Sequence, residues 1–430
     1  MRKIYLSVVG FSIICRIHAH AQTRPDTNYH KKETIFTPNV AEPDTDSYRP
    51  RSLRIDEIDL VSSYYKQNGD HSAVTGGIGT EKVTDISNGI TLNLVWLNNA
   101  MNKNTLAVGL GFDYHSSASQ AFVSATGASK TGGTRLYPSL DWTVENEKKG
   151  TSFGIGTYYS GEYNYSSLGA DLHFSKKTKD KNGEFGAKIQ AYFDNVTLIY
   201  PSEFIPKTTT STVIVTTASG STSSGGGKVS IPTSLRNTYT GSLSYSQMIN
   251  SRLQVMLLGD VVAQNGYLSL PFHRVYFSNG KDTIEKLPSS RFKLPLGFRL
   301  NYFLGDNIII RSYYRYYMDN WGIKSNTVSL EVPVKISPFF SVSPFYRYYN
   351  QSAAKYFAPY EAHSPTDQFY TSNYEFSKFN SNFFGVGFRM APPKGVLGWQ
   401  HLHELEIRYG HYTQNTDLIS DVVSVSLGFK

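Results

Sequence analysis

Apolar and polar residues alternate at the end of the chain, from about residue 419 to residue 430. One face of this segment carries Val423, Val425, Leu427 and Phe429, and the other carries Ser424, Ser426, Gly428 and Lys430. Because successive side chains of a β-strand point to opposite sides, a period of two predicts a strand with one apolar and one polar face. Such a strand at a C-terminus is typical of a membrane β-barrel, whose outer face meets lipid and whose inner face meets the lumen.

The same alternation recurs in about sixteen segments, most of which have the roughly nine to eleven residues that a tilted strand needs to cross a bilayer. Strands of soluble proteins are usually shorter, at about five or six residues. The sequence therefore predicts an all-β fold over residues 54–430, a transmembrane antiparallel β-barrel of about sixteen strands, within a range of about fourteen to eighteen. The predicted strands lie at 54–67, 88–97, 104–115, 135–145, 150–161, 165–176, 184–197, 235–249, 252–267, 291–303, 307–319, 324–336, 339–350, 376–390, 401–412 and 419–430.

The links between predicted strands alternate between short and long. Short links such as 98–103, 146–149 and 250–251 take turns with long polar ones at 68–87, 116–134, 198–234, 268–290 and 351–375. Outer-membrane barrels have short periplasmic turns and longer external loops. This phasing places both termini in the periplasm and the long links outside, although links 162–164, 320–323 and 413–418 are short and link 391–400 is long.

The N-terminus has the three regions of a secretory signal peptide over residues 1–21, with a basic start, an apolar run and a small-residue site at Ala19-His20-Ala21. Residues 22–53 show no periodicity and contain four prolines, which indicates a periplasmic tail. The segment 198–234 is rich in Ser, Thr and Gly. It is expected to be a mobile external loop, and folding into the lumen as a constriction is the alternative.

Composition supports the barrel and limits the chemistry. Aromatic residues make up 14% of the chain and charged residues only 18%, against an average of about 25% charged. The single cysteine, Cys15, lies in the expected leader, so the mature chain would have no disulfide and no thiolate metal site. The net charge of +8 includes Arg2, Lys3 and Arg16 of that leader, so the mature chain is only mildly basic and no nucleic-acid partner is expected for this exported chain. No cofactor is expected.

Charged residues on the polar faces of the strands are the candidate lumen lining. They are mainly acidic in the first nine strands and mainly basic in the later ones. Opposed walls of this kind could orient a solute in a water-filled lumen, or the charges could simply pair and fill the interior. The candidates are Asp113, Asp141, Asp171, Asp194, Arg299, Arg311, Arg315, Lys335, Arg347 and Arg408.

Catalytic and metal sites have weak support. His401 and His403 share the lipid-facing phase of a strand near a membrane boundary, where an interfacial pair is a simpler interpretation than a metal site. His115 is adjacent to Ser116, but no matched acid follows from spacing. The chain is therefore not expected to be an enzyme.

Several motifs resemble those of the DUF3570 family. They are Gly69–Glu81 (GDHSAVTGGIGTE), Ser116–Ser119 (SSAS), Tyr137–Trp142 (YPSLDW), Glu162–Ala170 (EYNYSSLGA) and Glu184–Lys188 (EFGAK). The resemblance implies an uncharacterised outer-membrane barrel of Bacteroidota-type bacteria, with no established activity and no catalytic residues to transfer. It also implies an association with small lipoproteins or redox enzymes of the envelope, and hence an accessory role in redox or metal handling.

The first of these motifs lies in the first long external link. Two interpretations stand equal: its polar groups line the channel mouth, or its glycines form a tight turn that seals the barrel top. The candidate mouth residues are Asp70, Ser72, Thr75, Gly76, Gly77, Gly79 and Glu81.

The leading functional hypothesis is a porin-like channel in the outer membrane of a Gram-negative bacterium, with lipid around it and a small hydrophilic solute inside. The alternative is a structural or scaffold barrel that binds a periplasmic or lipoprotein partner.

Overall fold

The computed structural model describes residues 52–116, 133–162, 164–204 and 232–430, and almost all of them are strands or the turns between strands. The expected leader and tail lie outside these residues. The first half of the sheet consists of β1 (Arg54–Asn68), β2 (Val83–Leu97), β3 (Lys103–His115), β4 (Gly133–Asn146), β5 (Thr151–Glu162), β6 (Tyr165–Lys177), β7 (Gly183–Thr197), β8 (Thr233–Asn250) and β9 (Leu253–Gly266). The second half consists of β12 (Ser290–Leu304), β13 (Ile308–Asp319), β14 (Lys324–Glu331), β15 (Val334–Ser337), β16 (Phe340–Gln351), β17 (Phe379–Met390), β18 (Leu402–Gln414) and β19 (Leu418–Phe429).

The large sheet has seventeen strands, of which β14 and β15 are two parts of one crossing. Pro333 lies between them and has no N–H to donate, so the ladder is interrupted there. Both parts pair with β13 on one side and β16 on the other. Counted as one, they leave sixteen antiparallel crossings, which confirms the predicted number.

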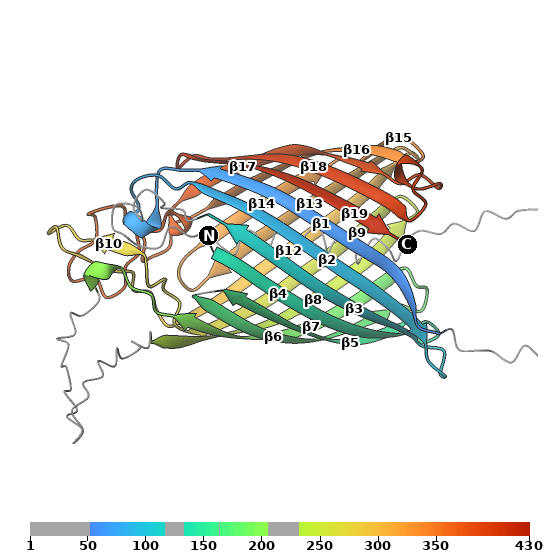
Figure 1. The fold of residues 1–430 in the computed structure, drawn as a ribbon, viewed down its shortest axis with the longest axis horizontal. Helices are drawn as coiled ribbons and strands as arrows, with labels where there is room; N and C mark the ends of the chain where they lie inside the picture. The colour runs from blue at the N-terminus through green and yellow to red at the C-terminus, as the bar shows by residue number, and fades with distance from the viewer. Residues whose placement is uncertain (1–51, 117–132, 163, 205–231) are drawn as a thin grey trace, which may run out of the picture. The chain divides into compact units, whose positions relative to one another are not determined.

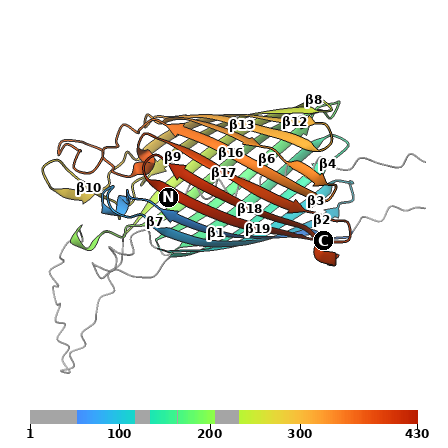
Figure 2. The same cartoon turned by 90° about the horizontal axis from the view of Figure 1, so that it is seen from above.

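The sheet closes on itself because the last strand pairs with the first. The register of β1 with β19 runs from Ile58 opposite Phe429 to Asn68 opposite Ile419. Strand β1 also pairs with β2, so every crossing has a neighbour on both sides and no edge is left open. Figures 1 and 2 show the resulting barrel of tilted strands from two directions.

Alternation sorts the side chains by face. Large apolar side chains point outward and are exposed, as with Ile189 (60%), Leu243 (58%) and Leu257 (56%) on adjacent strands. Leaving one such side chain in water forfeits roughly 1.5–3 kcal/mol, and water-soluble monomers rarely expose large contiguous apolar patches. An outer face of this kind is therefore suited to hydrocarbon.

The two ends of the barrel differ, as predicted. At the turn end, connections such as 147–150, 251–252 and 305–307 are tight. At the loop end lie the longer connections, which contain a second sheet of β10 (Arg274–Tyr276) and β11 (Asp282–Ile284) and the 3-10 turns η1 (Ala73–Thr75), η2 (Ser202–Phe204) and η3 (Tyr374–Phe376). A fourth turn, η4 (Val396–Gly398), lies in the long link between β17 and β18. No helix among the described residues is long and apolar enough to cross a membrane.

Strand boundaries agree with the prediction to within a few residues at most ends. The largest difference is β2, which begins at Val83 rather than at residue 88. Its added residues Val83–Ser87 include Asp85 and Ser87 on the inner face, opposite Tyr65 and Ser63 of β1. Polar residues at inward positions weaken the apolar signal, although the period of two continues through them.

An arginine on the outer face tests whether hydrocarbon surrounds it. Leu243 lies near the middle of β8, and Leu243→Arg should lower the free energy of unfolding in lipid vesicles by about 2–4 kcal/mol, the cost of a cation at the bilayer midplane. Urea titration of the refolded barrel measures this change. The matched control is Ser242→Arg on the inner face, beside Asp260 of β9. Equal costs for the two variants would contradict the assigned faces.

Candidate functional site

The acidic residues of the first strands point into the lumen, and the best defined of them have basic neighbours. Asp194 of β7 accepts hydrogen bonds from Arg236 Nε (2.7 Å) and Ser167 Oγ (2.7 Å). Asp113 of β3 accepts one from Tyr137 Oη (2.6 Å), and Arg135 Nη1 lies 4.0 Å from its carboxylate. These charges are therefore neutralised locally rather than presented to the opposite wall.

A second acidic cluster joins β4, β6 and β7. His173 Nδ1 lies 3.1 Å from Asp171 Oδ1 and 3.8 Å from Asp141 Oδ2, and Lys188 Nζ lies 3.2 Å from Asp171. Between the two aspartates runs β5, where Gly156 leaves room: a Cβ there would approach Asp171 to 2.4 Å.

The donor atoms of Asp141, Asp171 and His173 lie within 4.8 Å of one another, a set that a divalent cation can use. The imidazole of His173 and the ammonium of Lys188 both contact Asp171 Oδ1, so the cluster already provides partners for this carboxylate.

The later strands carry a larger set of inward-pointing cations. Glu331 of β14 pairs with both Arg311 (3.4 Å) and Arg408 (3.3 Å). Arg408 also contacts Glu406 at 3.1 Å. At the turn end, Arg389 donates to Glu404 at 2.7 Å, and near the loop end Arg291 Nε donates to Asp319 at 2.9 Å.

Arg315 and Arg347 differ from these arginines. Among the described residues, neither has a carboxylate oxygen within 4.0 Å. The Arg347 guanidinium lies over the ring of Phe383 at 4.9 Å, and Arg315 lies near Tyr349. The Arg299 guanidinium lies over Tyr313 at 5.8 Å, and Lys335 is exposed at the turn end, opposite Ser341.

The structure thus places every candidate lumen residue on the inner face, but it changes the picture of opposed walls. Arg135 and Arg236, which are not among the predicted lumen residues, lie at inward positions of β4 and β8 and pair with Asp113 and Asp194. Alternation alone could have found both, because Arg135 has the same phase as Asp141 and Arg236 the same phase as Ser242. The lumen therefore has an arc over β2–β9 in which Asp113, Asp171 and Asp194 have basic partners, and an arginine-rich arc over β12–β18, which we call the cationic arc.

The interfacial interpretation of His401 and His403 needs a correction. A register shift between Leu402 and Glu404 of β18 displaces His403 from the regular alternation. Its Nε2 lies 3.0 Å from Glu57 Oε1 of β1, so His403 contacts the first strand of the barrel and does not face lipid alone. His401 Nδ1 lies 3.1 Å from the carbonyl oxygen of Lys430.

The acid that spacing did not supply beside His115 is Glu162, whose Oε1 lies 3.4 Å from His115 Nε2. Ser116 Oγ accepts a hydrogen bond from the backbone N–H of Thr84 at 2.8 Å. That contact holds Ser116 at the start of the next loop and gives it a structural role at the end of β3.

At the loop end, three connections pack together, and we call residues 69–82, 267–289 and 352–378 the cap. Arg274 of β10 is buried, and its Nη1 donates to the carbonyl of Val74 in the first connection at 2.6 Å. Glu285 is also buried and accepts hydrogen bonds from Thr371 Oγ1 (2.5 Å) and from the backbone of Leu270 (2.8 Å). Buried charges with several partners fix the mutual arrangement of these loops.

Trp321 ties the cap to the barrel rim. It is 2% exposed and donates from Nε1 to the carbonyl of Ser290 at the start of β12. Its ring lies 5.9 Å from that of Tyr356 and 5.7 Å from that of Phe376, both in the cap. The guanidinium carbon of Arg291 lies over the same indole, 4.4 Å from the ring centroid, so Trp321 contacts both the cap and a lumen arginine.

The glycine-rich motif at 69–81 forms a tight turn inside the cap. Ser72 is fully buried, and its carbonyl accepts the backbone N–H groups of Gly77 (2.9 Å) and Thr75 (3.2 Å). Gly76 and Gly77 have φ of +80° and +88° and pack against Tyr276 and Ser372, where a Cβ would come within 2.6 Å of each neighbour. The motif therefore requires glycine both for its backbone conformation and for close packing.

The remaining mouth candidates divide between surface and interior. Asp70 and Gly79 are exposed, Thr75 donates to the carbonyls of Ser72 and Ile78, and Glu81 is 7% exposed. His71, which was not a candidate, stacks on Tyr374 with ring centroids 3.7 Å apart. Burial and the nearby carboxylate of Glu375 raise the pKa of Glu81 to about 7.

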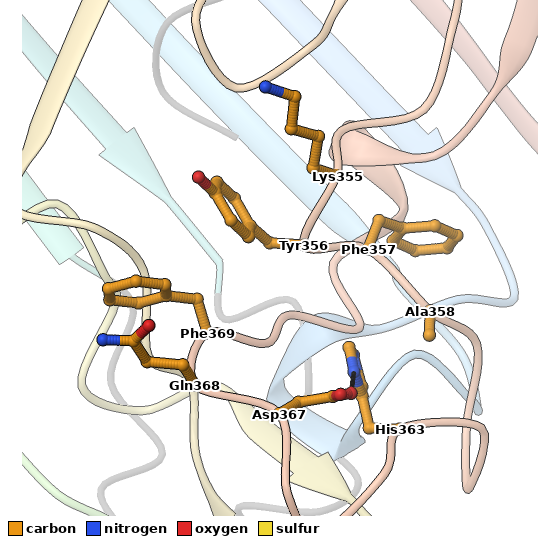
Figure 3. Close-up of a pocket in the computed structure, with 8 residues that line it drawn as sticks. All are labelled: Lys355, Tyr356, Phe357, Ala358, His363, Asp367, Gln368 and Phe369. Atoms are coloured by element: carbon orange, nitrogen blue, oxygen red, sulfur yellow. Dashed lines mark hydrogen bonds and ion pairs between the residues drawn. The ribbon is translucent and has the colours of Figure 1, made fainter.

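A pocket of about 320 Å³ lies within the 352–378 connection (Figure 3). In Figure 3 the rings of Tyr356 and Phe369 lie beside each other, with centroids 5.6 Å apart, while His363 and Asp367 face one another. His363 Nδ1 lies 3.2 Å from Asp367 Oδ2, and Nε2 lies 3.0 Å from the carbonyl of Thr371. The pocket is lined by Lys355, Tyr356, Phe357, Ala358, His363, Asp367, Gln368 and Phe369.

Most of the 198–234 connection, including its Ser-, Thr- and Gly-rich part, lies outside the described residues. At its start, Glu203 Oε1 accepts a hydrogen bond from Arg274 Nε at 2.5 Å, which joins this connection to the cap.

Strand closure, the apolar outer face and the charged lumen together define a transmembrane β-barrel. The chain belongs to the DUF3570 family, described as proteins of unknown function, whose model matches residues 46–422. The family indicated by the sequence motifs is therefore confirmed. Among curated proteins, no relative of the chain is found.

Solved structures of similar architecture are bacterial outer-membrane proteins. OccK1 (OpdK) of Pseudomonas aeruginosa has 8% identity and a TM-score of 0.38, with 87% of this chain and 97% of that chain covered. A BenF-like porin from Pseudomonas fluorescens has 8% identity and a TM-score of 0.39, covering 87% and 98%. A bacterial polysaccharide outer-membrane secretin has 9% identity and a TM-score of 0.42, covering 87% and 97%. At these values, the barrel assignment rests on the strand pairing of this chain itself.

Packing of the glycine motif can be tested separately from its backbone conformation. Gly77→Ala should loosen the cap, because its Cβ would lie 2.6 Å from the carbonyl oxygen of Ser372. We expect faster amide hydrogen exchange over residues 370–376 with little change in barrel strands. The matched control is Gly280→Ala, which has φ +78° but nothing within 4 Å of the added Cβ. Similar exchange rates in the two variants would show that the positive φ alone, and not close packing, requires glycine at position 77.

The raised pKa of Glu81 predicts a pH dependence of the cap. A carboxyl with a higher pKa in the folded state stabilises that state below its ordinary pKa of 4.5, and this contribution is lost as the pH rises to about 7. The change is on the order of 3 kcal/mol at most. Cap opening, measured by hydrogen exchange corrected for intrinsic rates, should increase from pH 5 to pH 8 in the wild type. Glu81→Gln should abolish most of this dependence, and a wild-type profile that is flat would refute the prediction.

Proposed function

We propose that this protein is a porin-like channel that carries a small hydrophilic solute across the outer membrane of a Gram-negative bacterium. The observation that carries the proposal is the lining of the lumen. Inward positions on most of the sixteen crossings hold mainly charged, hydroxyl, amide and glycine residues, while the outer positions are mainly apolar. Barrels of about sixteen strands are wide enough to leave an aqueous channel between such side chains.

The asymmetry of the two ends supports an orientation. Outer-membrane barrels turn their short connections to the periplasm and their long loops outward. On that pattern, the cap and the pocket between Lys355 and Phe369 face the exterior, and both ends of the described barrel chain lie at the periplasmic side. Residues 1–21 would act as the export signal and residues 22–53 as the periplasmic tail.

The cap gives this channel a selective entrance. The hydrogen bonds of the buried Arg274 and Glu285 and the stacked rings of His71 and Tyr374 hold three connections together at the loop end, so a solute enters beside an ordered structure. A solute that crosses this end next meets the charged side chains of β12–β18. Catalysis plays no part in the proposal.

Conductance of the refolded full chain in planar lipid bilayers tests the proposal. We expect discrete current steps in potassium chloride whose size depends on the lumen charges. Neutralising the row with Arg311→Gln and Arg315→Gln should change the step size, because both side chains point into the lumen. Arg252→Gln, in the turn between β8 and β9, serves as the control and should leave the steps unchanged. Folded protein that inserts into the bilayer without conducting would refute the channel.

A further inference from the structure

The register brings Arg315 and Arg347 to neighbouring positions on the cationic arc. Arg315 of β13 lies opposite Thr327 of β14, which in turn lies opposite Tyr349 of β16. Arg347 is two residues from Tyr349 on the same face. With strands about 4.8 Å apart and a rise of about 3.3 Å per residue, the two Cα atoms are roughly 12 Å apart. Two long side chains at that separation can reach one small ligand between them.

Carboxylate pairing separates these two arginines from other arginines of the lumen. Six lumen arginines have a carboxylate oxygen at 4.0 Å or closer, namely Arg135, Arg236, Arg291, Arg311, Arg389 and Arg408. The positions beside Arg315 are Gly297 and Thr327, and those beside Arg347 are Ser329 and Phe383. None of these is acidic, and the nearest glutamate, Glu331, is shared by Arg311 and Arg408.

The surroundings also select the shape of a counter-ion. Phe383 covers one face of the Arg347 guanidinium, with 4.9 Å between the guanidinium carbon and the ring centroid, which leaves the edge of the planar fork for hydrogen bonding. A guanidinium edge matches a carboxylate through two parallel N–H···O bonds. The ring of Phe383 offers an apolar surface beside the guanidinium, and Tyr349 lies two residues along the same face of β16. Together they fit a solute with a carboxylate at one end and an apolar or aromatic body at the other.

We infer that Arg315 and Arg347 form a binding site for small carboxylate-bearing solutes within the lumen. The inference rests on the proposed channel function, because the solute reaches the site through the lumen. It names the class of solute: small organic carboxylates pass in preference to cations and to neutral molecules of similar size. The partly buried cations bind such an anion strongly enough to concentrate it, while water in the lumen keeps the binding weak enough for release.

Ligand-observed NMR on the refolded full chain in detergent tests the site without requiring conductance. Benzoate is the probe, benzyl alcohol is the neutral analogue of the same size, and inorganic phosphate is the competing anion. We expect saturation transfer to benzoate and little to benzyl alcohol. Arg315→Gln or Arg347→Gln should weaken benzoate binding about ten-fold, as expected for loss of a charge-assisted hydrogen-bond pair. Arg389→Gln, which removes a lumen arginine that is paired with Glu404, is the charge-matched control and should retain binding.

Two further variants keep the test valid if an arginine substitution impairs folding. Thr327→Glu places a carboxylate next to Arg315 and should abolish benzoate binding while both arginines remain. Arg347→Lys keeps the charge but loses the planar fork and should weaken benzoate binding. The assignment would be overturned if benzoate and benzyl alcohol bound equally, or if neither arginine substitution changed benzoate binding. It would also be overturned if inorganic phosphate displaced benzoate at a concentration below that of benzoate. Benzoate binding without bilayer current would refute the channel and leave the site standing, and current without benzoate binding would do the reverse.

Discussion

Hydrogen bonding of the backbone in hydrocarbon is the constraint on which the structure depends. An unpaired N–H or C=O group in a bilayer costs several kcal/mol, so a sheet that crosses it must have no open edge. The pairing of β19 with β1 satisfies this requirement. Closure also fixes the direction of each side chain, because a shift of one residue in any register would move charged residues into lipid. Glu57 of β1 and His403 of β18 also meet beside this closure, with 3.0 Å between Oε1 and Nε2.

The same constraint explains how much could be predicted from sequence. Strands such as β12 and β19 were located by alternation alone, since lipid on one side and water on the other impose opposite chemistry on adjacent residues. Alternation does not reveal the break between β14 and β15, because the period of two continues through Pro333. The sequence predicts a start of β2 at residue 88 rather than Val83, because the inward residues Asp85 and Ser87 are polar and make this part of the strand less apolar.

The arrangement of charges was harder to predict than their direction. Alternation gives the face of Asp194 and Arg236, but it does not show that they are opposite each other, because that depends on the register of β7 with β8 across a connection of more than thirty residues. Likewise, Arg274 and Val74 are 200 positions apart and meet only because the barrel brings their loops to the same end. The cap therefore forms only when the barrel closes and its loops pack together. The glycine motif predicts where the cap lies but not which residues it contacts.

The positions of the cap and the cationic arc are linked through shared strands. The 352–378 connection, which holds the pocket and Tyr374, joins β16 to β17, and these two strands carry Arg347 and Phe383. Trp321 contacts both the cap and Arg291, which lies at the loop end of the cationic arc. A change in cap packing would therefore act first on β16 and β17, and through them on the orientation of the Arg347 guanidinium over its ring. The cap and the arginines of the cationic arc thus belong to one continuous part of the barrel wall.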